Sequence, residues 1–329
     1  MDLFKIISDI EKVDPEVYER FDTRRRAFKH LTGLGQKLTA AALPGLVGAL
    51  FNKAYGQGTG SLPADVVAVL NLALQLEYLE YNFYNAGLNT PGLIPASEVA
   101  AITTIRNDEA GHIKVLRQAL GNQAFSQSDV PVTAFDYTGQ GSFPDWNTNT
   151  AKYFGVAQSF VDTGVRAYKG GAPILINNKD ILQAALNIHS VEARHSSHIR
   201  TVRRALASNA VGTIVAADPN DLNNKPKSWI SGQDNGGAAP NATPVNTRPV
   251  YAAGGVVTVG STPLPSPAED NLMHAQFNAQ TGSTAPTGLT ITPAAASEAF
   301  DEPLDAATVK TIARNFRSAA GAALGLFNP

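Results

Sequence analysis

Four long stretches with helical periodicity most constrain how this chain can fold. In each stretch, apolar residues recur every three or four positions, which is the spacing that collects them on one face of an α-helix. We predict four long helices, over residues 61–87, 96–121, 146–169 and 179–208.

The connections between these stretches predict how the helices are arranged. The connections near residues 88–94 and 170–178 are short, whereas the connection over 122–145 is long. Short, long and short connections in this order are typical of a four-helix bundle with one crossover. We therefore expect an all-α bundle, with Ser61 capping its first helix and Pro63 in the first turn.

Ionisable side chains occupy positions on these apolar stripes where core residues are expected. They are Glu77 on the first stripe, Glu109 and His112 on the second, and Glu192 and His195 on the fourth. Burying an unpaired carboxylate costs several kcal/mol. No Lys or Arg lies on these stripes, so the carboxylates must be neutralised by protonation or by metal ions.

The spacing within the second and fourth stripes indicates metal ligands. A Glu-x-x-His pair places a carboxylate and an imidazole on adjacent turns of one helix face, where both can reach one ion. Two such pairs on the second and fourth helices are the arrangement of carboxylate-bridged dimetal bundles. We predict a metal site with Glu77 as a further ligand, for which Glu80 is the alternative. The competing interpretation places both pairs on solvated helix faces.

An internal repeat supports the metal site and exposes a gap in it. Glu77 precedes Tyr84 by seven residues, and Val161 precedes Tyr168 by the same interval. The chain therefore contains two related helix pairs, but position 161 is Val where the pattern predicts Glu. The predicted site lacks one carboxylate. Both tyrosines can alternatively be ordinary core residues.

Composition excludes several classes of function. The chain has no cysteine, which excludes disulfides, thiolate metal sites and cysteine nucleophiles. A formal net charge of -2 without a long basic run gives no footprint for nucleic acid. No segment reaches the roughly 20 uninterrupted apolar residues that a membrane-spanning helix needs.

The two ends of the chain differ from the bundle. Residues 1–56 contain paired arginines, Arg25 and Arg26, followed by a Gly/Ala/Leu-rich stretch, which predicts a twin-arginine export signal or, alternatively, an N-terminal helical arm. Export implies a periplasmic or extracellular protein, and the arm implies a cytoplasmic one. We assign the bundle to residues 57–209.

Residues 210–329 form a Pro/Gly-rich extension in which regular structure should be sparse. Apolar residues scattered through it predict an irregular cover packed on the bundle; they are Trp229, Tyr251, Val256, Val257 and Phe277. A last helix is expected after Pro303, with Val309, Ile312, Phe316 and Leu324 on one face.

The chain resembles the ferritin-like superfamily, and more narrowly the ferritin-like proteins that include the plant desiccation-related group and its bacterial and fungal relatives. Within the bundle, the resemblance is carried by residues 72–80, 108–112, 162–170 and 192–195. The tail resembles the same group at residues 268–271 and 299–304. The resemblance implies a four-helix bundle with one long crossover and a site for two metal ions.

The resemblance also implies a role for each candidate ligand. Glu109 and Glu192 would bridge the two ions, while His112 and His195 would each bind one of them. Glu77 would be a terminal ligand, and its counterpart on the third helix would be position 161, which cannot bind.

The resemblance implies further roles for residues around the ligands. Asp108 would orient a ligand histidine, which is the usual means of fixing its tautomer. Tyr84 and Tyr168 would hydrogen-bond ligand carboxylates across the bundle. Asp162 lies next to the altered position and is an alternative ligand, although it is about 100° further round the helix.

We expect the ions to be iron or manganese, with zinc as the alternative, because carboxylate and imidazole ligands suit all three. The leading hypothesis is an oxidoreductase that acts on dioxygen, peroxide or ferrous iron, with small oxidants as partners and no assigned catalytic residue. The competing hypothesis is an exported structural or desiccation-protective protein with a partly degenerate site. Either form can be an oligomer.

Overall fold

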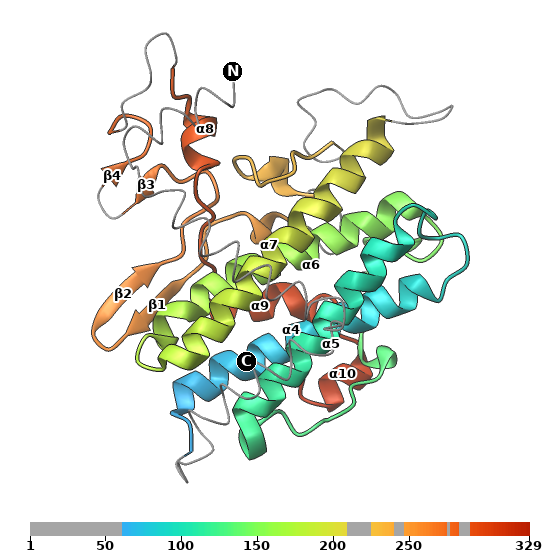
Figure 1. Cartoon of the computed structure of the whole chain (residues 1–329), viewed down its shortest axis with the longest axis horizontal. Helices are drawn as coiled ribbons and strands as arrows, with labels where there is room; N and C mark the ends of the chain where they lie inside the picture. Colours follow the sequence, from blue (N-terminus) through green and yellow to red (C-terminus); the bar gives the residue numbers. More distant parts are fainter. Residues whose placement is uncertain (1–60, 209–224, 240–246, 275–276, 283–289) are drawn as a thin grey trace, which may run out of the picture. The chain divides into compact units, whose positions relative to one another are not determined.

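The computed structural model describes residues 61–208, 225–239, 247–274, 277–282 and 290–329 (Figure 1). The predicted export signal within residues 1–56 lies outside the described residues. In the part that the structure describes, no helix is both long and apolar enough to cross a membrane.

Four long helices form the bundle (Figure 1). They are α4 (Ala64–Leu88), α5 (Val99–Leu120), α6 (Thr150–Gly171) and α7 (Lys179–Ser208). Short connections join α4 to α5 and α6 to α7, so each pair packs side by side in antiparallel directions. The long connection from α5 to α6 is the crossover, and the predicted fold class is confirmed.

The starts of α6 and α4 differ in how they are capped. Asn149 caps α6, where its side-chain oxygen accepts hydrogen bonds from the backbone N–H groups of Ala151 and Lys152 at 3.0 and 3.2 Å. The prediction that Ser61 caps the first helix is wrong, because Pro63 occupies the N-cap position in an extended conformation and makes no side-chain cap.

The crossover is held to the bundle by an aromatic cluster around Phe83. Its ring stacks on Tyr153 with centroids 4.6 Å apart and meets Tyr137 and Phe160 edge-on at 5.1 Å. The Tyr137 hydroxyl, which lies in the crossover, donates a hydrogen bond to the Leu79 carbonyl at 2.9 Å. These contacts make the long connection part of the core.

The C-terminal region contains short elements only. Strands β1 (Val256–Val259) and β2 (Thr262–Pro265) pair antiparallel, as do β3 (Met273–His274) and β4 (Phe277–Asn278). The helices there are α8 (Pro293–Ser297), α9 (Ala306–Arg314) and α10 (Ala319–Ala323). Short 3-10 helices lie at Gly121–Gln123, Val132–Ala134, Ala172–Leu175, Asp234–Gly236 and Arg248–Val250.

The single helix that we predicted after Pro303 is two helices. Asp305 caps α9 through hydrogen bonds from two backbone N–H groups, and α9 ends at Arg314. Helix α9 packs against α4 and α6 (Figure 1), and its residues Val309 and Ile312 are buried. Ser318 then caps the separate helix α10.

Arg166 on α6 ties the extension to the bundle. It is fully buried, forms an ion pair with Glu269 at 2.8 Å and donates hydrogen bonds to five backbone carbonyls, those of Val250, Ala252, Pro267, Glu302 and Pro303. Of the apolar residues expected in the cover, Tyr251 is buried, whereas Trp229, Val256 and Phe277 are about half exposed.

Candidate metal centre

Four predicted ligands from three helices meet in the interior of the bundle. Glu77 comes from α4, Glu109 and His112 from α5, and Glu192 from α7. One potential ligand atom from each residue lies within 4.8 Å of the others. All four side chains are buried, and Glu109 has no exposed surface.

The imidazole of His112 faces three carboxylates at once. Its Nδ1 atom lies 3.1 Å from Glu77 Oε2, 3.0 Å from Glu109 Oε2 and 3.3 Å from Glu192 Oε1. Atoms that bind one ion at about 2.1 Å lie about 3 Å apart. The spacing of these four atoms therefore suits ligands that share an ion.

His195, the fifth predicted ligand, lies on the other side of Glu109. Its Nδ1 atom is 3.1 Å from Glu109 Oε1 and 3.8 Å from Glu192 Oε1. One oxygen of Glu109 thus faces His112 and the other faces His195, while the two imidazole centroids are 6.3 Å apart. A carboxylate between two imidazoles is the arrangement expected of a ligand that bridges two ions.

Several polar atoms at this site are buried without a hydrogen-bond partner among the described residues. They are Glu109 Oε1, both carboxylate oxygens of Glu192 and Nδ1 of His195. The short separation of Glu109 Oε1 and His195 Nδ1 lacks hydrogen-bond geometry, so the two atoms face a common space. Unpaired buried polar atoms destabilise a fold, and bound metal ions would give these atoms partners. The residues present therefore fit a metal site.

The close packing of these side chains shifts the pKa values of the glutamates and histidines in the metal-free site. Burial raises the pKa of Glu77 to about 8, against the opposing effect of His112. Burial alone would raise the pKa of Glu109, but His195 and His112 hold it well below its usual range. The facing carboxylates raise the pKa of both histidines despite their burial. Metal binding must therefore displace protons.

Two predicted partners of the ligands are in place. Nε2 of His195 lies 3.1 Å from Asp108 Oδ2, which suits a histidine that donates through Nε2 and binds an ion through Nδ1. The Tyr168 hydroxyl donates a hydrogen bond to Glu77 Oε1, from α6 to α4. Both contacts fix the direction of a ligand side chain.

One comparison with known proteins identifies the domain that holds this site. Residues 65–205 match the family model of the ferritin-like domain, a span that covers all four helices. The chain carries a ferritin-like domain. No curated protein and no solved structure matched the chain. The narrower resemblance to desiccation-related proteins stays a prediction.

Two predictions about residues near the candidate ligands are wrong. The Tyr84 hydroxyl is buried and has no hydrogen-bond partner among the described residues, so it does not bind a ligand carboxylate. Asp162 instead accepts hydrogen bonds from Ser196 at 2.6 Å and from Arg200 and Tyr251 at 2.7 Å. Both of its oxygens are engaged there, because the residue after position 161 points about 100° further round the helix.

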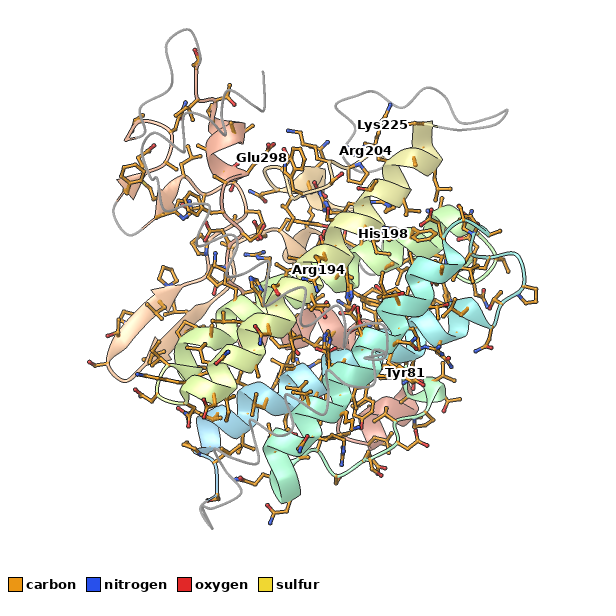
Figure 2. The ribbon with its side chains drawn as sticks, viewed as in Figure 1. Tyr81, Arg194, His198, Arg204, Lys225 and Glu298 are labelled. Carbon is orange, nitrogen blue, oxygen red and sulfur yellow. The ribbon has the colours of Figure 1, made fainter. Side chains whose placement is uncertain are left out.

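Sequence reasoning missed the buried network to which Asp162 belongs. Arg200 pairs with both Asp162 and Asp234 at 2.7 Å, although it does not lie on the apolar stripe of its helix. The partners lie far apart in the sequence, and no local pattern indicates them. His198, one turn beyond His195 on α7 (Figure 2), lies 3.0 Å from Glu98 and outside the site.

Position 161 is the remaining gap in the ferritin-like site. Val161 is fully buried in the apolar core and offers no ligand atom. Glu80, which we considered only as a substitute for Glu77, is buried as well, with 4% of its surface exposed. Its place three residues after Glu77, on the same helix face, was the available signal.

Proposed function

We propose that the ferritin-like domain binds two metal ions, iron or manganese, in a carboxylate-bridged centre. The observation that carries the proposal is the position of Glu109, whose two oxygens face Nδ1 of two different histidines. Ferrous and manganous ions both accept mixed carboxylate and imidazole ligands, and zinc is the alternative occupant.

We infer an oxidoreductase function, with dioxygen, peroxide or ferrous iron as the reactant. A pair of redox-active ions supplies the electrons for such reactions. The protein orients the ligands through Tyr168 and Asp108 and excludes bulk water by burying all five ligand side chains.

An apolar cavity next to the site supports a small, uncharged reactant. Its volume is about 270 Å³, and its lining includes Leu76 and Tyr168 of the bundle together with residues of β1 and α9. Tyr168 lines the cavity, and its hydroxyl donates a hydrogen bond to the proposed ligand Glu77. Dioxygen and peroxide are small enough to occupy this cavity.

The second candidate function is a structural or stress-protective protein in which the site is partly degenerate. Val161 favours this function, since it removes the carboxylate that the internal repeat predicts. The five remaining ligands favour metal binding. We propose export for either function, on the basis of the arginine pair in residues 1–56.

Metal content and iron oxidation separate the two functions. The purified chain is analysed for metals, and ferrous iron is then added in air while absorbance is recorded. We expect about two ions per chain and oxidation above the buffer blank. The variant with Glu109→Ala and Glu192→Ala should lose both properties. Glu98→Ala is the control, because Glu98 pairs with His198 and touches no ligand.

Wild-type protein with fewer than about 0.2 ions per chain and no oxidation would exclude the redox function, since a dimetal site needs roughly two.

A further inference from the structure

Glu80 is a buried carboxylate that forms no ion pair among the described residues. It lies on α4, one turn after Glu77, and only 4% of its surface is exposed. Its Oε2 atom has no hydrogen-bond partner among the described residues. A buried carboxylate without a donor or cation is destabilising unless it is protonated or binds a cation, and a metal ion at this place would neutralise it.

Gly164 on α6 creates the space in which Glu80 meets the proposed metal ligands. A Cβ atom added at Gly164 would lie 3.4 Å from Glu80 Oε1 and 3.2 Å from Glu192 Oε2. The two carboxylates therefore converge over the same glycine. Gly164 follows Val161 by one helical turn, so it lies on the same face of α6 as the position that lacks its expected glutamate.

Among the described residues, the cavity next to Glu80 is lined by no cationic side chain. A small cavity of about 10 Å³ adjoins it, between α4, α6 and α9, and its lining is apolar apart from Glu80 and Thr163. The Thr163 hydroxyl already donates to the Ser159 carbonyl at 2.6 Å. The cavity therefore holds no group that would neutralise an ionised Glu80.

We propose that Glu80 is the fourth carboxylate ligand of the dimetal site, supplied by α4 in place of the missing carboxylate at position 161 of α6. The proposal rests on the proposed function, because it requires that the site binds metal. Glu77 and Glu80 then both belong to the site, and Gly164 leaves room for the second of them.

Charge balance agrees with this assignment. Two divalent ions carry four positive charges, while Glu77, Glu109 and Glu192 together supply three negative ones. Glu80 supplies the fourth, and the ion pair network elsewhere in the bundle does not reach it. Four carboxylates make the buried centre neutral, which removes the cost of burying a net charge.

Calorimetric titration of the metal-free full chain with Mn²⁺ tests the proposal. Wild-type protein should take up two ions, and Glu80→Gln should lose one of them or bind it at least about 10-fold more weakly. Glu98→Gln is the matched control and should behave as wild type. Two ions bound by Glu80→Gln with wild-type affinities would overturn the proposal for Glu80 alone, whereas no binding by wild-type protein would overturn the dimetal function itself.

Thermal unfolding of the same variant distinguishes a ligand from a structural residue. Without metal, Glu80→Gln should melt at the same temperature as wild type or higher, since a neutral amide replaces an unpaired buried carboxylate. With saturating Mn²⁺, wild type should gain more stability than the variant, because it binds the ions more tightly. A variant that is equally destabilised with and without Mn²⁺ would show a structural role and overturn the proposal.

Discussion

Replacing Arg200 with Met should destabilise the fold strongly. The guanidinium is fully buried and lies 2.7 Å from both Asp162 on α6 and Asp234 in the extension. It also donates hydrogen bonds to the carbonyls of Lys227 at 3.0 Å and Trp229 at 2.9 Å. Arg200 therefore connects α7, α6 and the extension.

The expected magnitude follows from what the substitution leaves behind. Methionine fills much of the same volume, but two buried carboxylates lose their cation. Removing one partner of a buried ion pair costs about 3–5 kcal/mol. For a domain of this size, each kcal/mol lowers the melting temperature by about 2–4 °C, so the variant should melt about 6–20 °C below wild type.

Thermal unfolding followed by circular dichroism measures the effect. Arg194→Met is the matched control, since Arg194 lies on the same helix but is exposed (Figure 2). Its effect should stay within about 0.5 kcal/mol. If Arg200→Met melts within about 2 °C of the control, which is less than 1 kcal/mol, the buried network does not stabilise the fold as argued.

Three further outcomes test the metal site and the export signal. Tyr168→Phe should weaken metal binding about 10-fold because Glu77 loses its hydrogen bond, whereas Tyr84→Phe should not; equal affinities in a titration would contradict this. The pKa of Glu77 is about 8 in the metal-free site, so metal affinity should rise as pH increases toward 8. Calorimetry in two buffers should detect the protons that metal binding releases. A metal affinity that does not change with pH would refute this linkage. Replacing Arg25 and Arg26 with Lys should retain the chain in the cytoplasm on cell fractionation, while continued export would argue against a twin-arginine signal.

Local periodicity made the bundle and most of the candidate ligands predictable. The four helices and the crossover follow from apolar spacing and connection length, because both are properties of neighbouring residues. The Glu-x-x-His pairs are local as well, and they predicted where His112 and His195 would gather. One-turn spacing also applied to Glu80, but its burial depends on Gly164, which comes from another helix.

Contacts between distant segments could not be predicted in this way. Asp162 pairs with Arg200 and Tyr251, and the choice of partner depends on how the extension packs on α6. Tyr84 lies on the predicted face but finds no acceptor among the described residues, because position on a helix face does not fix the reach of a hydroxyl. Trp229 is about half exposed for a similar reason, since composition alone does not indicate which apolar residues are buried.

Anomalous diffraction from crystals of the Mn²⁺-loaded full chain tests the central claim most directly. The account predicts two anomalous peaks inside the bundle, one beside Nδ1 of His112 and one beside Nδ1 of His195, with the Glu109 carboxylate between them. Each peak should lie within about 2.3 Å of its histidine nitrogen, as for a bound first-row metal. Loaded crystals with no peak near these atoms, or with peaks only at the surface, would contradict the account.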